Sequence, residues 1–156
     1  MSSISIPTGT AMRDRGAHIA RCCRPGDLLI LSGALGAGKT TFVQGMGAGL
    51  GVTEQITSPT FVIARVYPTS VGPDLVHVDA YRLGSSLELD DLDLDSDLGA
   101  AITVVEWGEG KVEQLSEDRV VITIARSESD DDETRVMSVV GFGARWDDAA
   151  LQELLA

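Results

Sequence analysis

One segment of the sequence combines glycines, a lysine and a hydroxyl at a spacing that suits phosphate binding. Residues 33–40 read GALGAGKT and match the pattern G-x-x-x-x-G-K-[ST]. Glycines let the backbone curl until successive N–H groups point at phosphate oxygens, and a helix starting near Lys39 adds its positive end. The Lys39 ammonium can reach the β- and γ-phosphates, and the Thr40 hydroxyl can bind Mg²⁺. The predicted nucleotide contacts are Gly33, Gly36, Ala37, Gly38, Lys39, Thr40 and Thr41.

Two carboxylates are candidates for the magnesium and water chemistry that such a site requires. Asp79 ends the apolar segment Val76–Asp79, and Glu106 ends the segment Ile102–Glu106. Ligands of open α/β sheets bind at the carboxyl ends of parallel strands, so either side chain can hold Mg²⁺ directly or through water. Each carboxylate alone is also an ordinary polar strand end. Both together beside a P-loop favour the functional interpretation, and the sequence leaves open which one dominates.

Two further polar residues accompany these segments, each with two interpretations. His77 shares a face with Asp79 in an extended segment, so it could orient that carboxylate or be a packed structural histidine. Thr60, in Ser58-Pro59-Thr60, follows the P-loop helix, where a hydroxyl can sense the γ-phosphate and Mg²⁺. The same tripeptide is also ordinary turn chemistry.

The elements that must position these residues alternate between helices and strands. Apolar periodicity and turn residues predict three helices, at Thr8–Arg24, Lys39–Leu50 and Trp146–Ala156. They also predict strands at Leu28–Leu31, Phe61–Tyr67, Leu75–Asp79, Ile102–Glu106, Val120–Ala125 and Arg135–Val140. This order indicates an α/β fold of the P-loop NTPase type, a mostly parallel central sheet flanked by helices, with an antiparallel C-terminal addition. No repeat or linker divides residues 1–156, so we expect a single domain.

Composition narrows the possible partners and compartments. The chain has 12 basic and 24 acidic residues and a formal net charge of −12, which disfavours nucleic-acid binding through its overall field. Lys39 has only Lys111 as a fellow lysine, so no neighbouring lysine replaces it. The adjacent Cys22 and Cys23 lack metal or redox spacing and are expected as free thiols. With no apolar run of about 18 residues and no signal-peptide pattern, we expect a cytoplasmic protein without a membrane span.

The segment Leu87–Leu98, LELDDLDLDSDL, is the most acidic part of the chain. It lacks the glycine and glutamate positions of an EF-hand calcium loop. A solvated acidic face is the favoured interpretation, and a protein-docking surface is compatible with it.

Four motifs in this order resemble the TsaE (YjeE) family, bacterial ATPases of tRNA threonylcarbamoyladenosine biosynthesis. They are GxxxxGKTT at 33–41, SPT at 58–60, HxDxYR at 77–82 and VEW at 105–107. The resemblance extends from the first helix to about Val140 and leaves the tail uncovered. The P-loop is common to many folds, whereas the HxDxYR and VEW motifs together are much more specific.

The resemblance implies roles for individual residues. Thr40 and Glu106 would be the Mg²⁺ ligands, Asp79 would assist near the γ-phosphate or its water, and Thr60 would be the switch residue. The catalytic set would consist of Lys39, Asp79, Glu106 and Thr60. Trp107 would help to hold the site or a partner surface. Family members usually carry an acidic residue where this chain has Ala34, in a variable stretch of the loop, so we expect no loss there.

The resemblance also implies an activity and partners. The protein would bind ATP and Mg²⁺, hydrolyse ATP weakly alone, and act with TsaB and TsaD, which transfer a threonylcarbamoyl group to adenosine 37 of tRNAs reading codons beginning with A. Its hydrolysis would reset that complex between turnovers, and it would meet tRNA only through the complex. The first helix would pass near the adenine, but no base-contacting residue can be named.

Three other functions use the same P-loop. A small-molecule kinase usually carries a basic lid, whereas Arg119, Arg126 and Arg135 are scattered in the sequence. A GTPase switch usually carries D-x-x-G and N-K-x-D, and neither pattern is present. A nucleotide-dependent scaffold without catalysis is compatible with the same residues.

Overall fold

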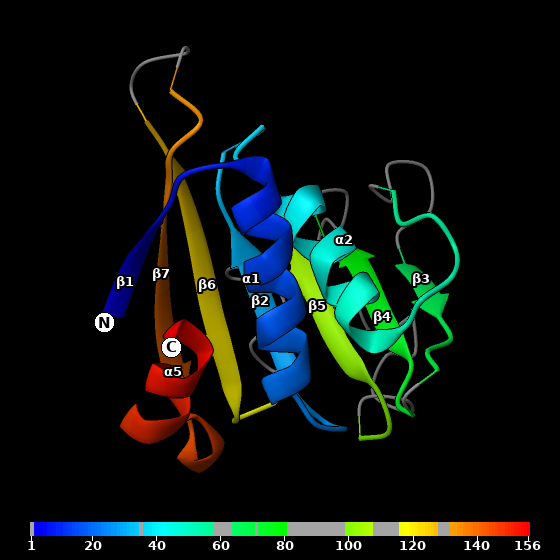
Figure 1. Cartoon of the computed structure of the whole chain (residues 1–156). Coiled ribbons are helices and arrows are strands. Elements are labelled where there is room, and N and C mark those ends of the chain that lie inside the picture. Colours follow the sequence, from blue (N-terminus) through cyan, green and yellow to red (C-terminus); the bar gives the residue numbers. More distant parts are fainter. Residues whose placement is uncertain are drawn as a thin grey trace.

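The computed structural model describes residues 2–34, 36–57, 64–70, 72–80, 99–107, 116–127 and 132–156. Its strands are β1 (Ser2–Ile6), β2 (Leu28–Ser32), β3 (Ala64–Tyr67), β4 (Leu75–Asp79), β5 (Ile102–Glu106), β6 (Arg119–Arg126) and β7 (Arg135–Phe142). Its helices are α1 (Gly9–Cys22), α2 (Lys39–Leu50), the 3₁₀ turn η2 (Ala144–Trp146) and α5 (Asp148–Leu155). The strands form one seven-stranded sheet in the order β1-β7-β6-β2-β5-β4-β3 (Figure 1).

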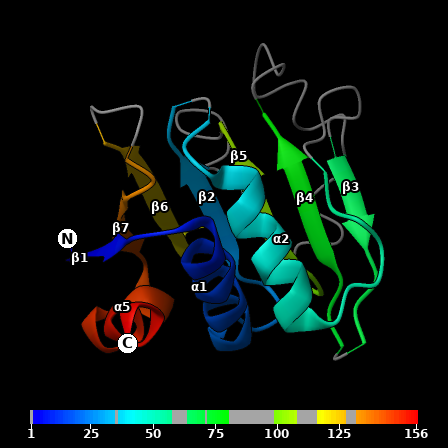
Figure 2. The same cartoon turned by 45° about the horizontal axis from the view of Figure 1, so that its top comes forward.

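The centre of the sheet is parallel and its margins are antiparallel. Strand β2 lies between β5 and β6 and is parallel to both, and β4 is parallel to β5. Strand β3 runs antiparallel to β4, β7 to β6, and β1 to β7. The arrowheads of β2 and β4 therefore point to the same edge of the sheet in Figure 2, where the P-loop also lies. This architecture confirms the predicted α/β fold with an antiparallel C-terminal addition.

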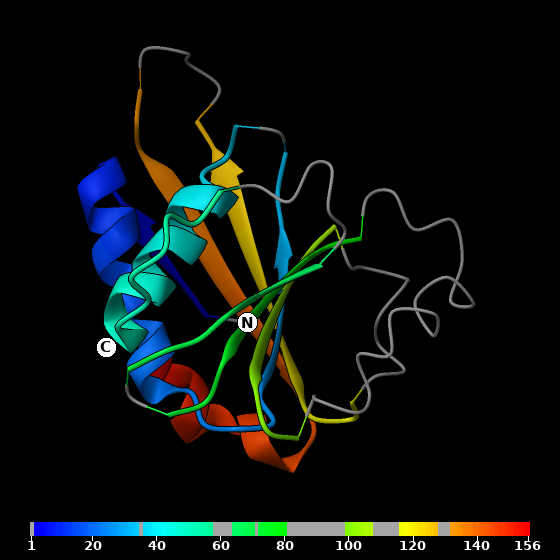
Figure 3. The ribbon, with the colours of Figure 1, turned by 90° about the vertical axis from the view of Figure 1, so that its right-hand side faces the viewer.

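The helices α1 and α2 pack side by side on one face of the sheet (Figure 3). Helix α1 begins at Thr8, whose side chain accepts a hydrogen bond from the Ala11 N–H at 3.0 Å. The two helices approach closely because glycines face the neighbouring backbone: a Cβ on Gly45 would collide with the backbone of Arg13, and one on Gly16 with that of Phe42. Glycine at these positions therefore lets α2 lie directly against α1.

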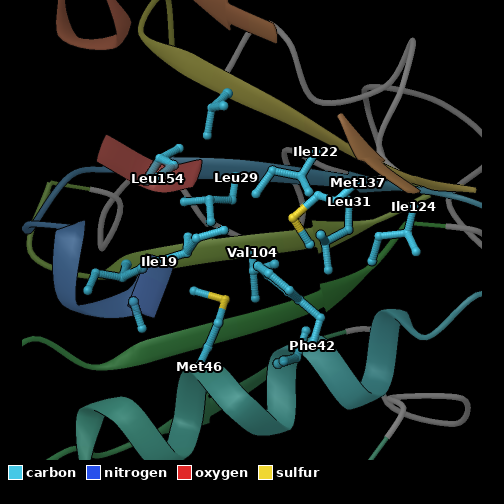
Figure 4. Close-up of a cluster of buried hydrophobic side chains, with 14 of the residues drawn as sticks. Ile19, Leu29, Leu31, Phe42, Met46, Val104, Ile122, Ile124, Met137 and Leu154 are labelled. Atoms are coloured by element: carbon cyan, nitrogen blue, oxygen red, sulfur yellow. The ribbon is translucent and has the colours of Figure 1, made fainter. Parts of the chain in front are cut away.

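The main core lies between this helical layer and the sheet (Figure 4). Alternate residues of each strand face the helices, as expected for side chains that point to opposite faces of a sheet. Ten buried members are labelled in Figure 4, namely Ile19, Leu29, Leu31, Phe42, Met46, Val104, Ile122, Ile124, Met137 and Leu154. The intervening residues form a smaller apolar cluster on the other face, which includes Leu28, Ile30, Val76, Val78 and Val105.

The structure changes several predicted elements. The first residues form β1, which the sequence analysis did not predict, because Ser-Ile alternation over five residues is a weak signal until β7 provides a partner. The terminal helix is shorter than predicted, since η2 and Asp147 precede it, and the Asp147 side chain caps it by accepting from Ala150 N–H at 2.9 Å. The predicted strand 61–67 is described only from Ala64, and the acidic segment 87–98 lies outside the described residues.

The tail after Gly143, which the family resemblance did not cover, is fastened to the body by a forked ion pair. The Arg145 guanidinium donates to both Asp27 carboxylate oxygens, at 3.0 and 2.9 Å, and to the Cys22 carbonyl at 3.1 Å. At the other end of α5, the Arg15 side chain donates to the carbonyls of Leu154 and Ala156. The tail is therefore packed against α1 and the sheet, and its buried leucines join the main core.

Two smaller expectations concern cysteines and membranes. Cys22 and Cys23 are both free thiols, as predicted. Among the helices of the described residues, none is long and apolar enough to cross a membrane.

Candidate functional site

The predicted phosphate-binding segment joins β2 to α2, at the edge where the parallel strands end. Gly36 and Gly38 have φ values of 79° and 111°, a region that favours glycine, and Gly38 is the residue immediately before α2. A Cβ on Gly33 would collide with the carbonyl of Ile124, so the loop also lies directly against β6. Leu35 lies outside the described residues. Gly36 and Gly38 thus allow the loop to curl, and Gly33 allows it to pack against β6.

Lys39, the first residue of α2, is buried at 6% exposure. Its ammonium donates hydrogen bonds to the carbonyls of Gly33 at 2.5 Å and Ala34 at 3.3 Å. It also lies 3.9 Å from the centroid of the Trp107 ring. Burial lowers the pKa of this lysine, and the negative charges of Glu106 and Asp79 act in the opposite direction. The ammonium is therefore held inside the loop, within the electrostatic reach of both carboxylates.

Asp79 and Glu106 lie side by side at the ends of two parallel strands. They are register partners in the β4–β5 ladder, with exposures of 9% and 4%. The ladder continues one residue further, because the Ala80 N–H donates to the Glu106 carbonyl at 2.9 Å. The predicted meeting of the two carboxylates at one edge of the sheet is therefore present, next to the amino end of α2.

His77 is fully buried and pairs with Glu106. Its Nε2 atom lies 2.5 Å from Oε2 of Glu106, and its Nδ1 atom has no hydrogen-bond partner in the described part of the chain. Register explains the pair: His77 lies opposite Val104, so Glu106, two residues on, is its diagonal neighbour on the same face. The sequence analysis considered Asp79 as the carboxylate that His77 orients, whereas the structure pairs it with Glu106.

Trp107 follows Glu106 in an unusual backbone conformation. Its φ of 60° is the one positive value of a non-glycine residue in the described ranges, and its N–H donates to the Leu31 carbonyl at 3.3 Å. A left-handed tryptophan is costly, and such conformations cluster at functional sites. Here the turn brings the indole ring to the Lys39 ammonium. Trp107 is therefore part of the site through its ring.

The donor set suits a magnesium–nucleotide pair better than a bare metal. Among the described residues, no three His, Cys, Asp or Glu side chains converge as a metal cage. The candidates are instead the Thr40 hydroxyl and the Glu106 carboxylate, two oxygen donors. Magnesium in nucleotide sites takes few protein ligands and completes its shell with phosphates and water, so these residues fit it.

A pocket of ≈ 160 Å³ adjoins the loop on the side away from the carboxylates. It is lined by Gly36, Ala37 and Gly38 of the loop, by Thr41 of α2, and by Thr8, Gly9 and Met12 at the start of α1. Glu133 and Arg135 complete it from the start of β7. The predicted contacts Gly36, Ala37, Gly38 and Thr41 thus share one pocket.

The predicted switch residue Thr60 lies outside the described residues, as do Tyr81 and Arg82 of the HxDxYR motif. Two arginines, by contrast, lie closer to each other in the fold than their spacing in the sequence suggests. Arg126 and Arg135, which are scattered in the sequence, are register partners in the β6–β7 ladder beside the P-loop. Only strand pairing could reveal this, because eight residues lie between them in the chain.

Comparisons with known proteins agree with these motifs. The family model "Threonylcarbamoyl adenosine biosynthesis protein TsaE" matches residues 6–136. A Streptomyces coelicolor protein named "tRNA threonylcarbamoyladenosine biosynthesis protein TsaE" is 57% identical over 138 residues, covering 86% of this chain and 93% of the relative. A Bacillus subtilis protein of the same name is 43% identical over 121 residues, 77% and 75% of the two chains. The crystal structure of YdiB from Bacillus subtilis superposes with a TM-score of 0.79 and 32% identity, covering 99% of this chain and 93% of that one.

Proposed function

The chain belongs to the TsaE family, and on this premise we propose that it is a Mg²⁺-dependent ATP-binding protein with weak intrinsic ATPase activity. It acts with two partner proteins, TsaB and TsaD, in the threonylcarbamoylation of adenosine 37 of tRNAs that read codons beginning with A. Its ATP hydrolysis resets the complex between turnovers. It meets tRNA through that complex.

The observation that carries this proposal is the position of the Lys39 ammonium. It is buried in the curl of the P-loop, with the ring of Trp107 against it and two strand-end carboxylates close enough to affect its pKa. Binding of Mg-ATP requires a cation at the β- and γ-phosphates, close to the carboxylates that would hold the metal. The Lys39 ammonium, between the loop carbonyls and these carboxylates, meets this requirement. A glycine-rich turn without a ligand needs none of these features.

Each residue of the site contributes a distinct physical effect. The N–H groups at the start of α2 and the Lys39 ammonium bind phosphate oxygens. Thr40 and Glu106 hold Mg²⁺, which when bound neutralises charge that develops on the phosphates. Asp79, beside Glu106 in the ladder, orients the water that attacks the γ-phosphate. Thr60 senses that phosphate as a switch residue.

The pocket beside the loop belongs to the nucleoside end of ATP. Carboxylates and Lys39 lie on the β5 side of β2, and the pocket lies on the β6 side. A nucleotide laid across the P-loop with its γ-phosphate at Glu106 directs its ribose and base there. The first turn of α1 is then close to the base, consistent with the resemblance.

The acidic net charge of the chain is consistent with the proposal that the partner proteins, and not this chain, bind most of the tRNA. A chain of net charge −12 gains little from contact with RNA phosphates, since such contact depends on Lys and Arg. Protein surfaces and ATP are then its direct contacts, and the partners hold most of the tRNA. Measurable tRNA affinity of the isolated chain at physiological salt would contradict this.

A phosphate-release assay tests the proposed function. We expect slow release from Mg-ATP by the chain alone, faster release with the partner pair and tRNA, and none without Mg²⁺. The Glu106→Gln variant, whose side chain keeps the same shape, is the matched control. Phosphate transferred to a small acceptor would favour a kinase, strong preference for GTP would contradict the assignment, and unstimulated binding without turnover would leave a nucleotide-dependent scaffold.

A further inference from the structure

The β6–β7 ladder ends in two arginines that face each other. Arg126, the last residue of β6, and Arg135, the first residue of β7, are register partners. Like charges directly opposite one another destabilise a strand pair. Two arginines in opposite register positions therefore oppose the pairing of their strands. In a chain with 12 basic and 24 acidic residues, they also concentrate scarce positive charge at one end of the ladder.

Both arginines reach the P-loop. The Arg135 Nε–H donates to the Ala37 carbonyl at 3.1 Å, and Nη1 of the same side chain donates to the carbonyls of Asp132 and Thr134. Nη1 of Arg126 lies 3.3 Å from the position that a Cβ on Gly36 would occupy. Arg135 thus links the loop to β7 through a hydrogen bond, and the Arg126 guanidinium lies close to Gly36 of the loop.

The sheet order determines which end of a nucleotide these arginines meet. Strand β2, which leads into the loop, has β5 on one side and β6 on the other. Asp79 and Glu106 lie on the β4–β5 side, and the arginine pair lies on the β6–β7 side. The arginines are therefore at the end opposite to the carboxylates and their metal.

The residues that line the adjacent pocket also indicate the nucleoside end of the nucleotide. Glu133 lines this pocket beside Arg135. A carboxylate repels terminal phosphates but accepts hydrogen bonds from ribose hydroxyls, as in dinucleotide sites. Arg126 does not line the pocket itself, but its guanidinium lies close to Gly36, which does. From there its plane can stack on a base and attract the first phosphate. A carboxylate and an arginine together suit the base, ribose and α-phosphate, which ATP and ADP have in common.

We propose that Arg126 binds the α-phosphate and nucleoside end of the nucleotide, while Arg135 positions the P-loop for it, so that the pair sets ATP and ADP affinity equally. The inference rests on the proposed function and deepens it. Lys39 differs, because its ammonium acts on the β- and γ-phosphates and so discriminates between the two nucleotides. The arginine pair thereby controls how firmly the product stays bound after hydrolysis.

Calorimetric titration of the full chain with Mg-ADP and with a non-hydrolysable Mg-ATP analogue tests the proposal. We expect Arg126→Ala to weaken both affinities by the same factor, about tenfold, as for loss of one charged hydrogen bond. Arg126→Lys keeps the positive charge but loses the planar guanidinium group. Its two affinities should therefore lie between those of the unaltered protein and of Arg126→Ala. Arg21→Ala is the matched control, since Arg21 is exposed in the last turn of α1, far from the loop, and should leave both affinities unchanged.

Two outcomes overturn the proposal. Unchanged affinities in Arg126→Ala, with unaltered thermal unfolding, would remove Arg126 from the site. A loss confined to the ATP analogue would place it at the γ-phosphate end instead. Lys39→Ala separates this failure from that of the proposed function: if it weakens triphosphate binding while Arg126→Ala does not, only the arginine inference fails, whereas unchanged binding in both variants overturns both.

Discussion

His77 and Glu106 form a buried pair, with Nε2 of the histidine 2.5 Å from Oε2 of the carboxylate. The two residues come from neighbouring parallel strands and are diagonal partners on the face that α2 covers. Because the histidine engages Oε2 of the carboxylate, the proposed Mg²⁺ would bind through the other oxygen. A histidine that orients a ligating carboxylate typically affects metal affinity through that ligand, without touching the metal.

Removal of His77 should therefore raise the Mg²⁺ requirement of the ATPase. We expect the half-saturating Mg²⁺ concentration to rise about tenfold in His77→Ala, as for other outer-shell partners. His77→Gln retains a side-chain N–H donor and should restore part of the effect. The measurement is phosphate release against Mg²⁺ concentration at saturating ATP.

Thr103→Val serves as the control for a merely structural effect of the histidine substitution. Thr103 is buried on the same strand as Glu106, one residue away from Val104 and on the other face of the sheet. Its loss should alter stability without moving the Mg²⁺ dependence. A Mg²⁺ curve that stays in place in both His77 variants would remove the positioning role.

Neutralising Glu106 should separate binding from turnover. Glu106→Gln keeps the side-chain shape but lowers its affinity for Mg²⁺, so we expect nucleotide binding to persist and Mg²⁺-dependent hydrolysis to fall by about a hundredfold or more. Asp79→Asn, the register partner, is the comparison variant. A larger loss in Asp79→Asn would make Asp79 the principal carboxylate. Stopped assays of phosphate release, with binding measured separately, decide between them.

Loss of the Lys39 ammonium should weaken triphosphate binding by about a hundredfold, because no neighbouring lysine can replace it and charge-assisted bonds in a buried site are strong. In the unaltered protein, burial lowers the Lys39 pKa, so its proton leaves at a lower pH than that of an ordinary lysine. Well below that pKa the Lys39 side chain is fully protonated, and it loses its positive charge as the pH rises through the pKa. ATP affinity should accordingly decline on the alkaline side, and ATP titrations of Lys39→Ala should show no such decline.

The ion pair between Asp27 and Arg145 should contribute strongly to stability. Asp27 is buried, and its carboxylate also accepts from the Arg24 N–H at 2.8 Å. Removing Asp27 leaves the partly buried Arg145 guanidinium without its carboxylate, so Asp27→Ala should lower the free energy of unfolding by about 2 kcal/mol. Asp14→Ala, an exposed carboxylate of α1, should change it by less than about 0.5 kcal/mol.

A double-mutant cycle isolates the coupling of that pair. If Arg145→Ala in the Asp27→Ala background costs as much as it does alone, the two residues act independently and the tail is held by other contacts. Urea unfolding of the four proteins supplies the free energies.

Close packing of α1 on α2 should be sensitive to one methyl group. A Cβ on Gly45 would meet the Arg13 carbonyl, Cα and carbonyl carbon, and backbone cannot move aside as a flexible side chain can. Gly45→Ala should therefore destabilise the protein by about 1–3 kcal/mol, despite the higher helix propensity of alanine. Gly99→Ala, where a Cβ meets nothing within 4 Å, is the matched control. Thermal unfolding of both variants measures the difference, and equal melting temperatures would contradict the packing argument.

Local patterns were enough to predict the elements that carry the site. Helix Lys39–Leu50 has the predicted bounds, because glycines precede and follow an apolar face. The strands ending in Asp79 and Glu106 were also predicted, because continuous apolar runs are typical of parallel strands buried on both faces. Strand β1 and the start of α5 were missed, because each depends on a distant partner or on a capping contact that periodicity does not report.

The sequence by itself determined the family, the glycine-rich loop between β2 and α2, and the carboxylates at the strand ends, because each is encoded by residue types at short spacing. Only the tertiary structure decided which of these residues meet. Strand register selected Glu106 as the partner of His77 and brought Arg126 opposite Arg135. Register between strands depends on packing across the whole sheet and on the glycine contacts that place α2, and such contacts join residues far apart in the chain.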